Sequence, residues 1–135
     1  MLAKETSSAF SRSKRAGAID DMVDLQKALR ELKEEFGSVA SAVISRDGLL
    51  IAADMPEGVT AETFTIMCAT LMGAASTAHS ELKIGQPKLI KISSEKHDMV
   101  LAGAGRKSIA VSIVPIGSKI DDLQRKLDKI ADSVS

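Results

Sequence analysis

The amino-acid sequence predicts an α+β (mixed α/β) fold, in which three helices pack on a five-stranded antiparallel sheet in the order α-β-β-α-β-β-β-α. Three observations indicate this fold. Two segments near the ends place apolar residues at steps of three and four, as amphipathic helices do. An Asp-Gly pair separates two short β-rich runs, which is typical of a hairpin. Three further short strand runs follow one another with short connections.

Length and composition limit the possible functions. The 135 residues suggest one domain, and a hydrophobic content of 44% is sufficient for a core. The formal net charge is zero, so nothing indicates bulk attraction to nucleic acid or to anionic lipid. Trp and Tyr are absent and Phe occurs three times, which leaves few aromatic platforms for stacking bases. We therefore expect no nucleic acid among the partners.

The first 17 residues differ from the rest of the chain. They are rich in serine and carry Lys4, Arg12, Lys14 and Arg15 against Glu5 alone. No apolar stretch of the kind found in a signal peptide is present, and we interpret residues 1–17 as a flexible basic tail before a domain over 18–135. A mitochondrial-type presequence is the alternative.

The first helix is expected over 18–36 and the last over the segment that begins near Ile116. Gly37 is a suitable stop for the first helix. In the last segment, Ser118 and Asp121 resemble a capping box with Asp in place of the usual Glu. The apolar positions of the two helices are Met22, Leu25, Leu29, Leu32 and Phe36, and Ile116, Ile120, Leu123, Leu127, Ile130 and Val134.

The strands are short and separated by turn residues. Residues 39–45 and 49–53 flank Arg46, Asp47 and Gly48, and Asp47 with Gly48 is predicted to form a hairpin turn. Three runs follow over 88–93, 98–104 and 108–114. In the last of these, Ile and Val alternate with Ser and Ala, as in a strand with two different faces.

The middle helix is expected over 60–82, with Thr60 as N-cap and Gly85 as stop. No Asp, Glu, Lys or Arg occurs between Glu62 and Glu81. A helix that is apolar or small most of the way round is buried on more than one side. A membrane span is the alternative, but Thr, Ser, His and Gly interrupt the apolar run and make it too short.

No segment has the pattern of a catalytic, cofactor or metal site. The run "GAGRKS" over 103–108 lies between two strands and lacks the spacing of a phosphate-binding loop. His79 and His97 have no second ligand at helical spacing. Cys68 is the single cysteine, so it forms no internal disulfide, and it is expected to be a buried small hydrophobe in a reducing, cytoplasmic compartment. The sequence indicates a protein that works through its surfaces.

The order of elements, the stretch "SAVISRDGLLIAADMPEG" and the small-residue helix "AETFTIMCATLMGAASTAHSEL" resemble the roadblock / dynein light chain family. The resemblance covers roughly 18–135 and is closest to compact prokaryotic members. It implies a profilin-like arrangement, with one helix on one face of the sheet and two on the other. It also implies a homodimer, or a heterodimer with a paralogue, joined edge to edge through the strand after the middle helix.

The resemblance implies a role as a regulator or scaffold of a Ras-like small GTPase, which is a separate chain. The small residues Ala69, Gly73 and Ser76 would allow the two middle helices to approach. The expected dimer interface comprises Ala69, Gly73, Ser76, Lys88, Ile90 and Ile92, and the expected partner-binding residues are Thr65, Met72 and His79.

Two other functions remain open. A nucleotide-independent adaptor would use the same dimer to dock a peptide. A small-ligand sensor would need a pocket lined by several polar groups, and the sequence offers mostly Ser, Thr and Ala. Arg46 as an arginine finger is a further hypothesis, which the position beside a turn does not favour.

Overall fold

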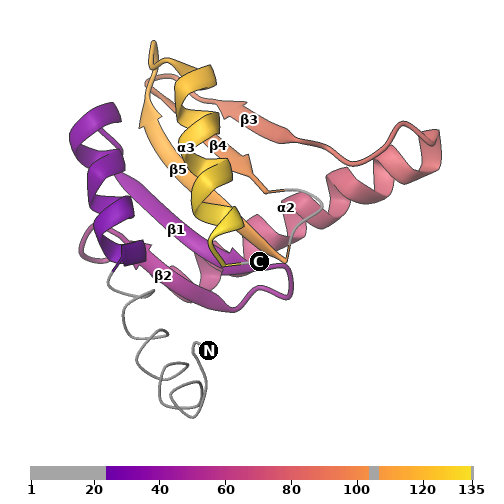
Figure 1. Cartoon of the computed structure of the whole chain (residues 1–135), viewed down its shortest axis with the longest axis horizontal. Helices are drawn as coiled ribbons and strands as arrows, with labels where there is room; N and C mark the ends of the chain where they lie inside the picture. Colours follow the sequence, from indigo (N-terminus) through magenta and orange to yellow (C-terminus); the bar gives the residue numbers. More distant parts are fainter. Residues whose placement is uncertain (1–23, 104–106, 135) are drawn as a thin grey trace, which may run out of the picture.

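The computed structural model describes residues 24–103 and 107–134 (Figure 1). The expected tail over 1–17 and the first residues of the expected first helix lie outside this part of the chain. The first helix is described over 24–36. The elements that follow are β1 (Ala40–Ser45), β2 (Leu50–Asp54), α2 (Ala61–Leu82), β3 (Leu89–Ser93), β4 (His97–Ala102), β5 (Ser108–Pro115) and α3 (Ile120–Asp132). The predicted order of helices and strands is confirmed.

All five strands pair antiparallel in one sheet with the order β2-β1-β5-β4-β3. The hairpin of β1 and β2 and the meander of β3, β4 and β5 are joined by the pairing of β1 with β5, in which Ala42 lies opposite Val111. The strands at the two edges are β2 and β3. In the chain these are the strands immediately before and after α2, so α2 connects the two opposite edges of the sheet.

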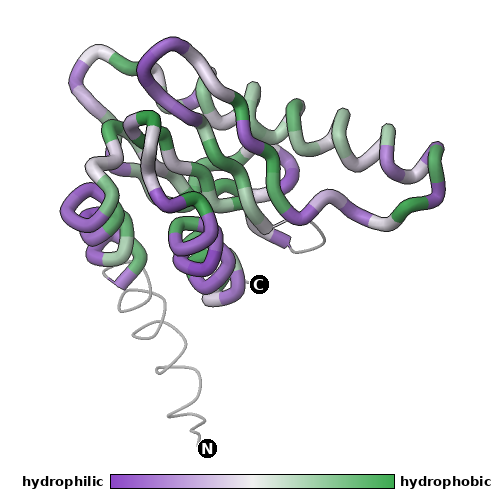
Figure 2. The backbone as a smooth tube through the Cα atoms, turned by 90° about the horizontal axis from the view of Figure 1, so that it is seen from above, coloured by the Kyte–Doolittle hydropathy of each residue, from purple (hydrophilic) through white to green (hydrophobic). Residues whose placement is uncertain are grey.

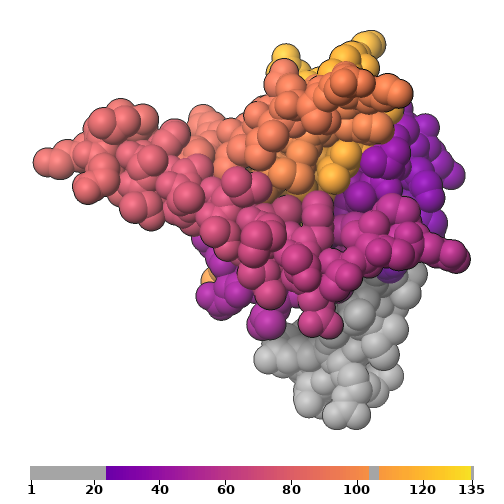
Figure 3. Space-filling model, turned by 180° about the vertical axis from the view of Figure 1, so that it is seen from behind, coloured from indigo at the N-terminus to yellow at the C-terminus, as the bar shows by residue number. Residues whose placement is uncertain are grey.

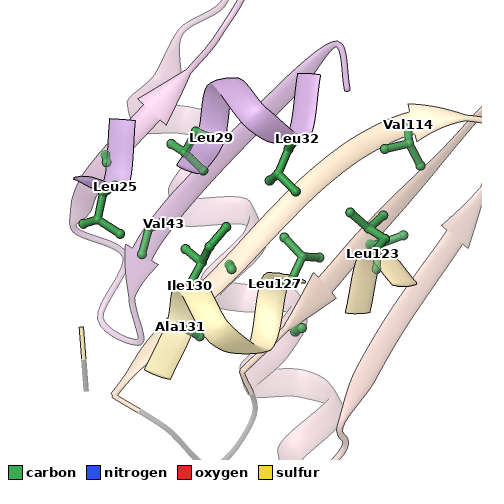
Figure 4. Close-up of a cluster of buried hydrophobic side chains, with 13 residues drawn as sticks. Leu25, Leu29, Leu32, Val43, Val114, Leu123, Leu127, Ile130 and Ala131 are labelled. Atoms are coloured by element: carbon green, nitrogen blue, oxygen red, sulfur yellow. The ribbon is translucent and has the colours of Figure 1, made fainter. Parts of the chain in front are cut away.

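The sheet separates two apolar clusters, and the helices lie as predicted, two on one face and one on the other (Figure 2). The 24–36 helix and α3 cover one face. Leu25, Leu29 and Leu32 there belong to one apolar cluster with Leu123 and Leu127 of α3 (Figure 4). On the opposite face, α2 and the sheet together form a second cluster. Its buried members are Ala42, Ile44, Leu101, Ile109 and Val111 of the sheet and Cys68 and Met72 of α2.

The alternation in β5 fits these two faces. Ile109 and Val111 belong to the cluster beneath α2, whereas Ala110 faces the other two helices. The serines on this second face are buried but hydrogen-bonded: the Ser108 hydroxyl donates to the Ala131 carbonyl at 2.8 Å, and Ser112 shares a 2.7 Å hydrogen bond with Ser38. Small side chains with satisfied hydroxyls therefore let α3 approach the sheet closely.

The capping residues of two helices differ from the predictions. The helix α2 ends at Leu82 with Lys83 in the left-handed conformation (φ +57°), so the C-cap is Lys83 and not the predicted stop, Gly85. The N–H of Lys83 then reaches the Ser80 carbonyl, and the N–H of Ile84 the His79 carbonyl. At α3 the N-cap is Lys119 without a side-chain cap, because the Ser118 hydroxyl donates to Pro115 instead of to the helix. The predicted capping box with Asp121 is wrong.

Gly103, at the end of β4, is held in a conformation that only glycine fits. Its φ is +108°, and a Cβ there would lie 2.6 Å from the Ser108 carbonyl oxygen. We expect Gly103→Ala to lower the free energy of unfolding by about 3 kcal/mol or more, because backbone strain and a backbone clash add. Urea denaturation measures this loss.

Gly85→Ala is the matched control. Gly85 also has a positive φ, of +90°, but nothing lies within 4 Å of the added Cβ. It should lose only about 1 kcal/mol, from backbone strain alone. Equal losses in the two variants would show that the close contact at Gly103 has no energetic weight.

Candidate functional site

The outer surface of α2 is the main feature that the packing of the protomer does not explain. Of the 22 residues in this helix, Thr65, Cys68 and Met72 are buried. They recur at steps of three and four and form the stripe that faces the sheet. The sequence predicts burial on several sides, but within one protomer only this stripe is buried.

Large apolar side chains remain on the surface of α2 and of the segment after it. The exposed fractions are 50% for Ile66, 53% for Met67, 70% for Leu82 and 61% for Ile84. No residue of α2 after Met72 is buried, and this second half of the helix projects from the molecule (Figure 3). Exposed large apolar side chains near both ends of a projecting helix are typical of a protein–protein interaction site.

The strand β3, which follows this helix, forms an open edge of the sheet. Ile90 is half-buried against the cluster beneath α2, whereas Ile92 is 39% exposed. Lys88 and Lys91 are exposed. An unpaired edge presents backbone N–H and C=O groups that another strand can pair with.

The turn of β1 and β2 packs on α2. Gly48 has a φ of +90°, and a Cβ added there would lie 3.7 Å from Ile66 and 3.8 Å from Ala69. The Arg46 guanidinium donates to the Ser76 hydroxyl at 3.3 Å, and the Thr65 hydroxyl lies 3.4 Å from the Gly48 carbonyl oxygen. The Arg-Asp-Gly stretch therefore forms a turn that is attached to the helix.

The predicted interface residues occupy different positions on the protomer. Gly73 is exposed, and nothing lies within 4 Å of a Cβ added there. Ala69 and Ser76 are half-buried on the side of α2 that contacts the turn. They are therefore partly covered by the protomer's own chain.

The predicted partner-binding residues need a correction. Thr65 is 1% exposed and Met72 is fully buried, so neither side chain reaches the surface of the protomer. Both lie on the stripe that faces the sheet, seven residues or two helical turns apart. His79 is half-buried, and its Nδ1 atom has no hydrogen-bond partner among the described residues.

The large apolar side chains that α2 and the next segment expose are not among the site residues predicted from the sequence; they are Ile66, Met67, Leu82 and Ile84. The signal was present in the sequence. These residues lie outside the stripe of Thr65, Cys68 and Met72, and a helix with one buried stripe leaves its other apolar positions in solvent.

Among the described residues, the structure gives little support for a reactive cysteine or for a metal site. Cys68 is buried, and burial raises the pKa of its thiol from 9.0 to about 11, so the reactive thiolate is disfavoured. No group of three His, Cys, Asp or Glu side chains in this part of the chain is placed to hold a metal ion. None of the helices described has both the length and the hydrophobicity of a membrane span.

Similar proteins are found both by sequence and by structure. The chain is 30% identical over 115 residues to the uncharacterized protein MJ0714 of Methanocaldococcus jannaschii. The matched region covers 83% of this chain and 96% of that protein. The uncharacterized protein MJ0310 of the same organism is 29% identical over 109 residues, or 78% and 96% of the two chains.

Solved structures share the fold at low identity. Myxococcus xanthus MglB superposes with a TM-score of 0.73 at 11% identity, over 82% of this chain and 91% of that one. A Roadblock/LC7 domain from Streptomyces avermitilis gives 0.71 at 13% identity, over 81% and 92% of the chains. The gliding protein MglB from Thermus thermophilus gives 0.67 at 15% identity, over 83% and 91%.

The sequence model of one family matches two thirds of the chain. It covers residues 24–113, from the first helix through most of β5, and so includes both the turn at Asp47 and the whole of α2. With this match and with the arrangement of helices and strands described above, the chain belongs to the Roadblock/LC7 domain family.

Proposed function

We propose that this chain is a non-enzymatic, dimeric regulator or scaffold that binds a Ras-like small GTPase in the cytoplasm. The observation that carries the proposal is the surface of α2, a helix that is apolar most of the way round but has one buried stripe. The proposed dimer joins two β3 edges into one continuous sheet and places the two α2 helices side by side on one face.

Two features of the protomer support this dimer. The edge of β3 is open, and pairing it with a second copy would satisfy its free backbone groups. The second half of α2 extends away from its own sheet (Figure 1), so a second sheet and helix can cover it. Fully burying one large apolar side chain contributes about 1.5–3 kcal/mol, and α2 with the segment after it exposes several.

The GTPase part of the proposal follows from the family. The family resemblance implies regulators and scaffolds of Ras-like small GTPases, and the chain itself has no phosphate-binding loop of the G-x-x-x-x-G-K-[S/T] type. The GTPase would therefore be a separate protein. The exposed face of the paired α2 helices is the surface that we propose for it, with Ile66 and Met67 in place of the buried Thr65 and Met72.

Affinity capture from the source organism's lysate tests the partner. The full chain is immobilised, and the lysate is applied in parallel with excess GDP or with a non-hydrolysable GTP analogue. Retention of a small GTPase that differs between the two nucleotides would support the proposal. Retention of another protein in equal amounts with both nucleotides would instead indicate the adaptor. A metabolite that raises the melting temperature of the chain would indicate the ligand sensor.

We expect Gly73→Glu to dissociate the dimer and to abolish GTPase binding together. Gly73 is exposed and a Cβ there meets no atom, so the protomer itself tolerates the change. In the dimer, two carboxylates would meet across the axis, and we expect the dissociation constant to rise about 100-fold or more. Light scattering at several concentrations measures it.

Gln26→Glu is the control for added charge, because Gln26 is exposed on the 24–36 helix, on the other face of the sheet. It should remain dimeric. A Gly73→Glu variant that is still a monodisperse dimer would contradict the proposed packing of the two helices.

We expect Arg46→Ala to change any stimulation of GTP hydrolysis less than about threefold. The Arg46 side chain is half-buried and bonded to Ser76, which is the role of a turn residue attached to a helix. An arginine finger must instead reach the phosphates of a partner, and its loss reduces the rate by a factor of about 1,000 or more. The single-turnover rate of GTP hydrolysis by the captured GTPase, measured with the unaltered chain and with the Arg46→Ala variant, decides between these roles.

A further inference from the structure

The sheet face that carries α2 is only partly covered within one protomer. The helix packs chiefly on β1 and β2 of its own sheet. On the same face, β3 and β4 present Ile90, Ile92 and Met99, which we call the β3–β4 strip. Ile90 and Met99 are half-buried beside the cluster beneath α2, and Ile92, which lies opposite Met99, is 39% exposed. The strip is therefore an apolar surface that the helix of the same chain leaves partly in solvent.

The second half of α2 continues a flank that packs against the sheet in the first half. Phe64 and Leu71 are half-buried against the cluster beneath α2. Since an α-helix turns by about 100° per residue, Ala75, Ala78 and Leu82 lie on the same flank. Ala78 and Leu82 are exposed, Leu82 by 70%. This flank therefore has a sheet beneath it where the helix begins and solvent beneath it where the helix ends.

Pairing of two β3 edges would bring these two surfaces together. The helix runs from the β2 edge toward the β3 edge, and its second half projects from its own sheet (Figure 1). When two edges pair antiparallel about a two-fold axis, the two sheets become continuous and both α2 helices lie on the same face. The strands next to the edge are then the partner's β3 and β4. The projecting half of each helix therefore meets the β3–β4 strip of the other copy.

The size of the contact also favours a second copy as the occupant of the strip. Stable interfaces bury about 800 Å² on each partner. The edge of the five-residue strand β3 is about 17 Å long and a sheet layer is about 10 Å thick, so edge pairing by itself covers only about 170 Å². Residues 73–82 add about 15 Å of helix. Because each copy contributes this helix half once and the strip once, the exchange enlarges the contact about threefold.

We propose that two copies exchange the second halves of their α2 helices, so that Leu82 of each copy packs on the partner's Ile92 and the partner's Met99. The inference rests on the proposed dimer and adds to it which part of each helix the dimer buries and what covers that part. The first half of α2, with Ile66 and Met67, stays available to a GTPase.

The strength of the dimer tests the role of Leu82. Leu82→Ala in the full chain should raise the dimer dissociation constant about 100-fold, because a symmetric dimer loses two apolar contacts, each equivalent to about a factor of ten. Leu82 is 70% exposed in the protomer, so the fold tolerates the change. Sedimentation over a range of concentrations measures the constant.

Ser80→Ala is the matched control. Ser80 is also exposed and lies two residues before Leu82, but about 160° away around the helix. It should change the dissociation constant less than about threefold. Equal changes in the two variants, or no change in Leu82→Ala, would overturn the inference.

Cross-linking tests which surfaces meet. Chains with Leu82→Cys and chains with Ile92→Cys are co-expressed, and a short bis-maleimide is added to the purified protein. A covalent dimer that contains one chain of each kind, identified by its mass, is expected. Ser80→Cys with Ile92→Cys should give much less of it, and equal yields would overturn the inference. The unaltered chain is the control for Cys68, whose side chain is buried.

The outcomes separate this inference from the proposed function. A stable dimer that is indifferent to Leu82→Ala and does not cross-link between positions 82 and 92 contradicts the exchange, while the dimer and its GTPase surface stand. An unaltered chain that sediments as a monomer at all concentrations contradicts both. If that monomer captures another protein and Leu82→Ala abolishes the capture, the exposed helix half binds that protein, and the exchange is again overturned.

Discussion

The pairing of β1 with β5 is the contact on which the rest of this structure depends. It joins a hairpin from the first half of the chain to a meander from the second half, and it places β2 and β3 at opposite edges. The connection between them must then cross the whole sheet. Four strand spacings span about 19 Å, whereas 22 helical residues span about 33 Å. The helix is longer than the sheet is wide, which agrees with its projecting second half.

The two faces of the sheet solve the packing problem differently. Where two helices cover one face, the central strand supplies Ala110 and the hydrogen-bonded Ser108 and Ser112, and the helices supply leucines. Where one helix covers the other face, the sheet supplies Ile44, Ile109 and Val111, and α2 supplies the small or flexible Cys68 and Met72. On the first of these faces, the leucines of the helices therefore meet small side chains of β5, which permits dense packing.

Much of the fold could be predicted from the sequence because its signals are local. The apolar steps of the 24–36 helix and α3, the Asp-Gly turn and the alternation in β5 each lie within a few residues. The site was less predictable. Which stripe of α2 faces the sheet depends on where the whole sheet lies, so a helix apolar most of the way round did not reveal that Thr65 and Met72 are buried.

The division of α2 into a buried stripe and an exposed apolar surface has a consequence for divergence among related chains. Substitutions at Thr65, Cys68 and Met72 disturb the packing against the sheet and are limited by folding. Substitutions at the half-exposed Ile66 and Met67 remove few contacts within the protomer, so the fold tolerates them. A duplicated copy of such a chain can therefore acquire a new binding preference by changing positions next to one another in sequence, without first losing the ability to fold.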